Sequence, residues 1–414
     1  MWSLDILAWI LVTGAVITPL YAYLGYPLLL RMAARESTDR RAPETRPWEL
    51  PTVSITVPAY NEEDHIADVL ERLLRADYPA ERLQILVVSD ASSDRTDEIV
   101  ESFRDRGVEL HRRTSRRGKT AAENAAGPLL RGEIVVNTDA SVKVEPGAIR
   151  ALVERFRDPA VGLASGRDVS VAADSHEQNA GESRYVGYEM RVRAMETRAG
   201  GIVGASGCLY AIRRELHLVP LPGNLSRDFA AALITRERGF RAVSVDDAVC
   251  RVPRTGSLRR EYRRKVRTMV RGMRTLAFKR ALLDPRRHGT FAWKLWSHKI
   301  CRWLVPWALA GGAVGALLLS RWLPTAVIPV LPTLLLGGVL LTAVAWHWPA
   351  ARPMPALLSS LAHGVLSNLA AMEAALRAPM KTGSAVWDPT PRGTTSGLSA
   401  QARTNADGVR SPQS

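Results

Sequence analysis

The chain has 414 residues, enough for one large domain or two, and its formal net charge is +15. Hydrophobic residues make up 46% of it, with long apolar runs at both ends and a middle part typical of a soluble domain. Residues 251–287 hold fourteen Lys or Arg against two acidic residues. Because a basic run beside an apolar segment is more often a cytoplasmic flank than a nucleic-acid site, we expect no nucleic-acid partner. Cys208, Cys250 and Cys301 lack CxxC spacing, which argues against a disulfide framework or a zinc site.

The N-terminal apolar run, residues 6–30, is long enough to cross about 30 Å of hydrocarbon. Asp5 precedes it and several Arg follow it, a charge order opposite to that of a cleaved signal peptide. We therefore predict an uncleaved transmembrane helix over 1–30 with its start outside the cell. A linker rich in charge and Pro follows over 31–50, on the cytoplasmic side.

The middle of the chain alternates predicted strands and helices. Strands are predicted at 51–57, 85–88, 134–138 and 161–165, because these runs are apolar and mostly β-branched. Helical spacing of apolar residues follows the first of them, and turn and cap signals open further helices after the others. This alternation predicts an α/β domain with a mainly parallel, doubly wound sheet over 51–287.

Carboxylates follow three of these strands: Glu62, Asp90 and Asp139. In open α/β sheets the carboxyl ends of the strands line the ligand crevice, so these side chains should converge there. A single Asp at such a place is as well explained as a surface turn residue. Three of them, together with Lys119 on a Gly turn, predict a nucleotide site, with acids for base and ribose and with Lys and a metal for phosphates.

The motifs around these residues resemble a known family. The stretches 57–62 (VPAYNE), 88–96 (VSDASSDRT), 118–119 (GK) and 138–141 (TDAS) resemble the opening motifs of family 2 glycosyltransferases. That family has the GT-A fold, a Rossmann-like domain, and inverts the anomeric centre. The resemblance covers roughly residues 52–276, and the apolar segments are arranged as in the cellulose and hyaluronan synthases.

The resemblance implies a role for each matching residue. The residues that would contact the uridine of a UDP-sugar are Pro58, Tyr60, Glu62 and Asp90. Lys119 would lie near the nucleotide and donor, and Asp139 would bind the diphosphate together with Mg²⁺ or Mn²⁺. The family often carries a second acid two positions on, where this chain has Ser141, a poorer ligand for a hard cation.

The acceptor half begins with a long polar helix predicted over 177–198, best explained as an amphipathic cover for the domain. Next, the Gly-rich stretch 204–213 precedes a predicted strand. It resembles the acceptor loop of the family, which would give Ser206, Gly207 and Cys208 contacts with the acceptor; a tight turn explains the same residues equally well.

A helix is predicted to begin at Ser226 and to stop at Gly239. Asp228, in its first turn, is either a complement to the helix dipole or the general base, because it matches the position of the base in the family. Arg227 replaces the acid that commonly precedes that base. We favour the base, which would take the proton of the acceptor hydroxyl during in-line, inverting attack.

The basic stretch that follows matches a motif of processive members, Gln-X-X-Arg-Trp, at residues 264–268. Arg264 stands at the Gln position, and Arg267 keeps the charge that would bind the departing diphosphate. Thr268 replaces the Trp thought to touch the acceptor sugar, which puts polymerisation in doubt but not sugar transfer.

The C-terminal third is predicted to return to the membrane. Trp and cationic residues over 288–303 predict an interfacial amphipathic helix. A membrane region of two to three helices is predicted over 304–378, with 304–319 and 323–345 as spans, whereas 355–376 either spans or lies in the interface. The tail, 379–414, is polar and largely disordered in this prediction.

The sequence as a whole predicts a multi-pass inner-membrane glycosyltransferase of the hexosyltransferase type, with its catalytic domain in the cytoplasm and in contact with membrane lipids. It would transfer sugar from a nucleotide-sugar, such as a UDP-sugar, to a growing polysaccharide or a lipid-linked acceptor in envelope or exopolysaccharide synthesis. Two alternatives within this function are a processive synthase and a single-addition transferase. A third hypothesis is a catalytically silent scaffold subunit that binds the nucleotide-sugar without turnover.

Overall fold

The computed structural model describes residues 2–36, 48–172, 180–254, 258–320, 329–348 and 354–380. Most of the predicted linker, the start of the predicted span 323–345 and nearly all of the predicted tail lie outside the described residues.

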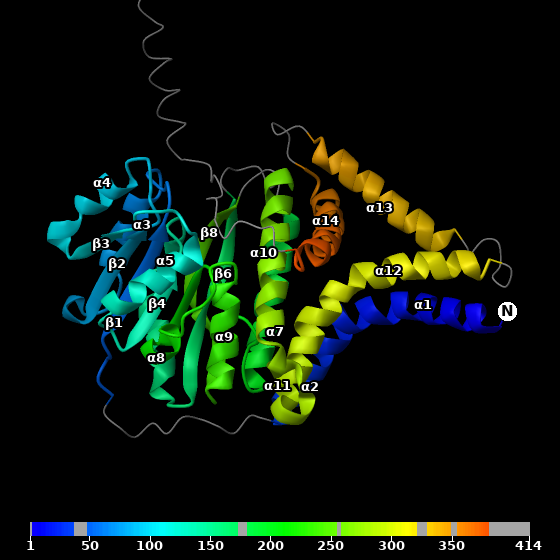
Figure 1. Cartoon of the computed structure of the whole chain (residues 1–414), viewed down its shortest axis with the longest axis horizontal. Helices are drawn as coiled ribbons and strands as arrows, with labels where there is room; N and C mark the ends of the chain where they lie inside the picture. The colour runs from blue at the N-terminus through cyan, green and yellow to red at the C-terminus, as the bar shows by residue number, and fades with distance from the viewer. Residues whose placement is uncertain are drawn as a thin grey trace, which may run out of the picture.

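The central element is a mixed, mostly parallel sheet with strand order β3-β2-β1-β4-β7-β6-β8-β5 (Figure 1). The strands are β1 (Val53–Ala59), β2 (Leu83–Ser89), β3 (Val108–Arg112), β4 (Ile134–Thr138), β5 (Lys143–Val144), β6 (Val161–Ala172), β7 (Leu209–Arg213) and β8 (Arg241–Arg254). Strands β1 to β4 are parallel where they pair, and β6 is parallel to β8, whereas β7 runs antiparallel to both β4 and β6. The predicted α/β class with a mainly parallel sheet is confirmed.

Helices cover both faces of this sheet. One face carries α3 (Ile66–Leu74), α4 (Thr96–Glu101) and α6 (Ala148–Val153), and the other carries α5 (Lys119–Ala126), α8 (Arg214–His217) and α9 (Arg227–Glu237). In α3 the apolar side chains recur at helical spacing and are almost fully buried: Ile66, Val69, Leu70 and Leu73. Burial of each such side chain contributes about 1.5–3 kcal/mol relative to exposure. The sheet is therefore held between two apolar layers, and its strand ends remain available for a site.

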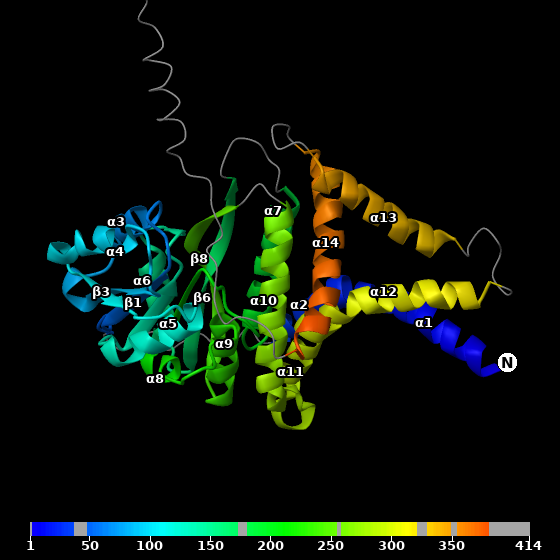
Figure 2. The ribbon, with the colours of Figure 1, turned by 45° about the horizontal axis from the view of Figure 1, so that its top comes forward.

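The remaining helices lie beside the sheet. The N-terminal helix runs through α1 (Trp2–Leu20), a π-turn η1 (Tyr21–Gly25) and α2 (Tyr26–Glu36). The others are α7 (Ala180–Arg198), α10 (Leu258–Phe278), α11 (Pro285–Leu295), η7 (Trp296–Ile300), α12 (Cys301–Leu318), α13 (Val330–Trp346) and α14 (Ala356–Arg377). Figures 1 and 2 show α1 and α12 leaving the domain together, and the two helices are in contact along their length. A Cβ on Gly315 would lie only 2.7 Å from the carbonyl oxygen of Ala8, so the absence of a side chain permits this close packing.

Among the described helices, two are long and apolar enough to cross a membrane: Ser3–Ala34 and Pro285–Leu318. A shorter apolar helix spans Pro332–Trp346. The first coincides with the predicted N-terminal anchor. The second joins the predicted interfacial helix, 288–303, to the predicted span that follows it. These helices satisfy the length and composition of a span, and the membrane itself stays a prediction.

Two expectations for the C-terminal helices gain detail. The polar residues of the predicted interfacial helix face the protein rather than a surface, because Lys294 and His298 are each only 2% exposed. Helix α14, which was expected either to span or to lie in the interface, packs along α10 and α7 (Figure 2). Its Ser359 and His363 are buried in that packing, while Leu357 and Leu361 stay exposed on the other side.

Candidate active site

A cavity of about 480 Å³ opens beyond the carboxyl end of β4. Its lining comes from the start of α5, the residue after β4, the loop before β7, the first turn of α9, and helices α7, α10, η7, α12 and α14. Seven of the predicted site residues line it: Lys119, Asp139, Gly207, Cys208, Asp228, Arg264 and Arg267. The fold thus brings together residues that lie almost 150 positions apart in the sequence.

Lys119 is the centre of the sheet side of this cavity. Its Nζ donates to Oδ1 of Asp139 at 2.5 Å and to the carbonyl oxygen of Gly207 at 2.9 Å. Burial lowers the pKa of Lys119, but the nearby carboxylates, above all Asp139 and Glu123, raise it by more, so the pKa lies above its ordinary value of 10.5. The ammonium group therefore stays charged at neutral pH, as a group that binds a diphosphate must.

The turn before Lys119 is shaped by Asp90. Gly118 has φ +87°, and its N–H donates to Oδ2 of Asp90 at 2.5 Å. The N–H of Arg117 donates to both carboxylate oxygens at 3.1 Å, and Arg113 adds an ion pair at 2.5 Å. Asp90, predicted to contact the nucleotide, is 4% exposed and already accepts these bonds. In this structure it positions the lysine turn, and a contact with the nucleotide stays a prediction.

Three other predicted nucleotide residues lie at the carboxyl end of β1, outside the lining of the cavity. Tyr60 is covered by the guanidinium of Arg116, whose carbon lies 3.7 Å from the centre of the ring. Glu62 is 4% exposed, and its backbone N–H donates to Oγ1 of Thr96 at 2.8 Å. Pro58, the remaining member, is buried inside β1. A nucleotide that stacked on the Tyr60 ring would have to displace Arg116.

Asp228 lies in the first turn of α9, two positions after the N-cap residue Ser226. The predicted cap position is confirmed, but the Ser226 hydroxyl donates to Oδ1 of Asp228 at 2.5 Å instead of capping the helix. Oδ2 of Asp228 faces the Gly-rich loop, because a Cβ on Gly207 would lie 3.2 Å from it. The carboxylate is partly exposed and lines the cavity. It is thus held in one orientation and remains accessible to an acceptor.

The three predicted acceptor residues of the Gly-rich loop do not all face the cavity. Gly207 and Cys208 line the cavity, whereas Ser206 is 1% exposed and donates to Oδ1 of Asp168 at 2.6 Å. Ser206 also accepts the N–H of Cys208 at 3.0 Å. The hydroxyl predicted to contact the acceptor is therefore occupied by the protein and shapes the loop.

Sequence reasoning missed a buried ion pair between Glu123 and Arg227, two residues that lie close to Lys119 and Asp228 in the sequence. Glu123 is 1% exposed, and its Oε2 lies 3.8 Å from Nε of Arg227. Burial raises the pKa of Glu123 above its ordinary value of 4.5, although Lys119 and Arg227 lower it. Arg227 also donates to the carbonyl oxygen of His217 at 2.8 Å. The signal was present, since Glu123 follows Lys119 by four residues on one helix face.

The basic helix α10 contributes Arg264 and Arg267 to the opposite wall. Arg264 donates to Oε1 of Glu261 at 2.6 Å. Arg271, one turn beyond Arg267, donates to the carbonyl oxygens of Gly223 and Leu225. Helix α10 is thus fixed against the loop that leads into α9, with its Arg side chains on the cavity.

The residues at Asp139 fit a divalent cation only in a limited way. Among the described residues, no group of three or more His, Cys, Asp or Glu could hold a metal ion. Asp139 offers one carboxylate, whose Oδ1 accepts from Lys119. Mg²⁺ commonly uses one or two carboxylates and completes its shell with water and substrate phosphates. The donor set therefore fits a cation that arrives with a diphosphate, held on the protein side by Asp139.

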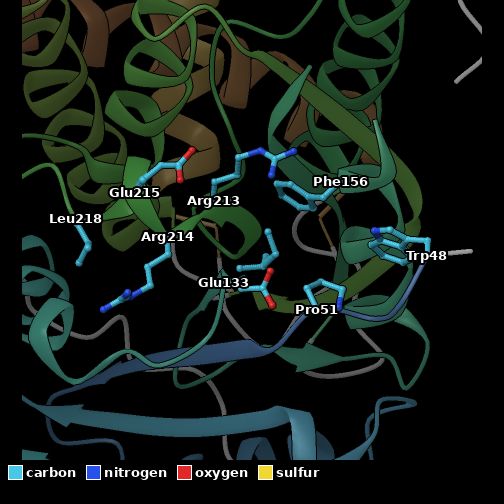
Figure 3. A pocket seen from close by; sticks show the side chains of 9 residues that line it. Trp48, Pro51, Glu133, Phe156, Arg213, Arg214, Glu215 and Leu218 are labelled. Carbon is cyan, nitrogen blue, oxygen red and sulfur yellow. The ribbon is translucent and has the colours of Figure 1, made fainter. Parts of the chain in front are cut away.

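A second cavity, of about 390 Å³, lies at the amino ends of β1 and β4 (Figure 3). Its lining includes Trp48, Glu133, Phe156 and the charged run 213–215. The Arg213 guanidinium carbon lies 5.5 Å from the centre of the Phe156 ring. None of the predicted site residues lines this cavity.

Part of the chain is similar to known proteins. Residues 54–218 match the family model "Glycosyl transferase family 2", so the chain contains a domain of that family. The beta-monoglucosyldiacylglycerol synthase of Trichormus variabilis is 29% identical over 40% of this chain and 36% of its own. An N-acetylglucosaminyltransferase of Mesorhizobium japonicum is 28% identical over 51% of this chain and 53% of its own.

The fold has a solved counterpart. The mannosyltransferase PcManGT from Pyrobaculum calidifontis, in complex with GDP-Man and Mn2+, matches 90% of this chain and all of its own, with a TM-score of 0.65 and 24% identity. This similarity confirms the predicted GT-A fold. The chain spans about half, or less, of the length of the curated relatives it matches.

Proposed function

We propose that this protein is a membrane-bound, inverting glycosyltransferase that transfers one sugar from a nucleotide-sugar to a lipid-linked or polysaccharide acceptor. The observation that carries this proposal is the cavity, which holds Lys119 with Asp139 on one side and Asp228 on the other. A site for the diphosphate and a carboxylate for the acceptor hydroxyl therefore share one space. The family of the matched domain supports the same activity.

In this mechanism Asp228 takes the proton of the acceptor hydroxyl as its oxygen attacks the anomeric carbon. The bond from that carbon to the diphosphate breaks on the opposite face, so the anomeric centre inverts. Lys119 and Arg267 stabilise the charge that develops on the departing diphosphate. Asp139 would hold Mg²⁺ or Mn²⁺, which would supply further neutralisation of the charge on the diphosphate.

The donor is predicted to be a UDP-sugar. The solved counterpart holds GDP-Man, so a GDP-sugar is the second candidate. A base that stacked on the Tyr60 ring in place of Arg116 would be bound by its π-face, which pyrimidines and purines share. The donor base is therefore a question for direct assay.

The acceptor is proposed to lie at a membrane, since the crevice is continuous with the foot of the apolar helices α1 and α12 through Tyr23 and Arg302. The relatives include glycolipid synthases. Thr268 stands where processive members carry Trp, which favours single addition over polymerisation. The silent-scaffold alternative retains nucleotide binding and predicts no turnover.

The test is nucleotide release by the full chain in nanodiscs, across UDP- and GDP-sugars, with Mg²⁺, Mn²⁺ or a chelator, for wild type and Asp139→Asn. The matched control is Asp246→Asn, an exposed acid on β8 outside the cavity. We expect release with one donor class, dependent on the cation and reduced at least tenfold in Asp139→Asn alone. Nucleotide binding without release for every donor would support the scaffold instead.

A further inference from the structure

One part of the cavity wall carries three cationic side chains, from α7, η7 and α12. Arg193 projects from α7, Lys299 from η7 and Arg302 from the start of α12, and all three line the cavity. Lys299 lies beside the Gly-rich loop, because its Nζ is 3.6 Å from the position of a Cβ on Gly204. Its Nζ also lies 5.2 Å from the centre of the ring of Phe229, the neighbour of Asp228. These three cations therefore share one cavity with the proposed base, Asp228.

Their hydrogen-bonding capacity is largely unused within the described residues. Arg193 is 9% exposed, and its Nε and Nη1 have no hydrogen-bond partner there. Only its Nη2 donates, at 3.4 Å, to the carbonyl oxygen of Ala205. The side chain of Arg302 is likewise 9% exposed, and its Nε and Nη2 are buried without a partner. Buried donors without partners are costly, and native proteins rarely leave them so.

The negative charge beside these cations does not balance them. Glu189 is the carboxylate in contact, at 2.8 Å from Arg302 and 3.9 Å from Arg193, and it also bonds to Nε2 of His298 at 2.7 Å. No carboxylate among the described residues forms an ion pair with Lys299. Asp168, elsewhere on the wall, accepts from Ser206 and Cys250. Glu196, which bonds to Nδ1 of His298 at 2.6 Å, is the second carboxylate nearby, so the three cations outnumber the two carboxylates by one.

The donor diphosphate does not explain this excess. Lys119 and Asp139 sit at the Gly207 end of the Gly-rich loop, whereas Lys299 sits at the Gly204 end. Asp228 faces the Gly207 end, since its Oδ2 lies 3.2 Å from the position of a Cβ on Gly207, whereas the ring of its neighbour Phe229 faces the Gly204 end. Lys299, and Arg193 through its bond to Ala205, therefore lie at the end of the loop away from Lys119 and Asp139.

The cluster also meets the foot of the apolar helices. The guanidinium carbon of Arg302 lies 5.8 Å from the centre of the ring of Tyr23, in η1 of the N-terminal helix. From there α1 and α12 leave the domain together (Figure 1), with large exposed apolar residues such as Leu24 and Leu304. A molecule bound at the cations can extend its apolar part along these helices.

We propose that Arg193, Lys299 and Arg302 form the binding site for the phosphate that links lipid and sugar in a lipid-linked acceptor. This inference rests on the proposed function and specifies its acceptor class. Guanidinium groups with free N–H donors match the geometry of a phosphate and bind it with charge-assisted hydrogen bonds. The phosphate would anchor the acceptor, and its apolar chain would lie along α1 and α12.

The experiment measures binding, without turnover, by the full chain in nanodiscs of zwitterionic lipid. The probes are radiolabelled dodecyl phosphate, dodecanol, inorganic phosphate and a uronic-acid disaccharide, each corrected for empty nanodiscs. The variants are Arg193→Gln, Lys299→Gln and the charge-preserving Arg193→Lys. Arg191→Gln is the matched control, because Arg191 is exposed on the same helix and does not line the cavity. Binding of nucleoside diphosphate is measured in parallel for each variant.

We expect dodecyl phosphate to bind more tightly than dodecanol or inorganic phosphate. The two Gln variants should weaken it at least tenfold, while Arg193→Lys and Arg191→Gln keep most of the affinity. Equal affinity in wild type and the folded Gln variants would overturn the proposal, as would equal binding of inorganic phosphate or tighter binding of the uronic acid. A variant that also loses nucleotide binding counts as misfolded, and the other Gln variant then decides. Absence of nucleotide binding in wild type would instead contradict the proposed function.

Discussion

The two halves of the domain use buried charge in different ways. On the nucleotide side, Asp90 accepts hydrogen bonds from the N–H groups of Arg117 and Gly118 and pairs with Arg113. Its charge therefore stabilises the turn before Lys119. On the acceptor side, Glu123 and Arg227 form a looser pair, and Arg193 retains unused donors. The nucleotide half is thus preformed by its own hydrogen bonds, whereas the acceptor half has buried N–H donors that a ligand can satisfy.

The largest expected effect distinguishes the two kinds of ion pair. Arg227→Leu leaves Glu123 buried beside other carboxylates, and we expect a loss of about 3–5 kcal/mol in the free energy of unfolding. Arg113→Leu leaves Asp90 with its backbone donors, and the loss should be about 1–2 kcal/mol. Denaturant unfolding of the two variants measures both. Equal losses would mean that the backbone donors contribute little to Asp90.

A smaller change tests how tightly the Gly-rich loop holds the proposed base. The Cβ of Gly207→Ala would lie 3.2 Å from Oδ2 of Asp228, so the carboxylate must shift. Misplacement of a catalytic group by about 1 Å can cost about 100-fold in rate, and this contact requires a shift of a few tenths of an ångström, so we expect kcat to fall by about 3- to 10-fold. Gly187→Ala, on α7, meets nothing within 4 Å and serves as the control. An unchanged kcat in Gly207→Ala would show that this contact does not position Asp228.

The effect of Glu123 on stability should depend on pH, and this dependence tests how buried charge acts on the acceptor side. Its pKa is raised by burial, so the folded state favours the protonated form, and the stability of the folded state declines as pH rises through that pKa. Glu123→Gln imitates the protonated form and should gain stability relative to wild type at neutral pH. The gain should vanish below pH 4.5, the ordinary value of a Glu pKa. Thermal unfolding between pH 4 and pH 8 measures it, and a gain independent of pH would contradict this cause.

The smallest effect concerns backbone strain on the nucleotide side. Ala91 has φ +61°, in the left-handed region that favours Gly, directly after Asp90. Ala91→Gly should raise the free energy of unfolding by about 0.5 kcal/mol, because relief of strain exceeds the added entropy of the unfolded chain. Asn61, at φ +50°, is the control, since Asn adopts this region more readily and Asn61→Gly also removes its hydrogen bonds to Ser93. That control should lose stability.

The sequence predicts the fold well where the local pattern is strong. The runs at 85–88 and 134–138 are continuous and apolar, and both lie in buried strands, β2 and β4. The strand β8 was not predicted, because its acids and arginines break the apolar pattern and its pairing with β6 is determined by tertiary contacts. The short strand β5 likewise exists only through its partner β8.

The site divides in the same way. Lys119, Asp139 and Asp228 follow from local motifs, and the cavity unites them. The hydroxyl of Ser206 and the carboxylate of Asp90 were predicted to contact ligands, yet they bond to the protein. Whether a side-chain oxygen in a loop bonds to the protein or stays available to a ligand depends on partners that are distant in the sequence. Arg193 and Lys299 were missed for the same reason, because only the fold places them on the wall of the cavity that Asp228 lines.

The measurement that tests the central claim most directly separates donor binding from turnover in Asp228→Asn. The full-length wild type and the Asp228→Asn variant, both in nanodiscs, are titrated with the donor that the wild type uses. Single-turnover rates are then measured at saturating concentrations of donor and acceptor. We predict unchanged donor affinity and a rate lower by about 10²- to 10⁴-fold, since a general base contributes about that much. A rate equal to that of wild type would contradict the assignment of Asp228 as the base. A loss of donor affinity that accounts for the whole effect would place Asp228 in the donor site instead.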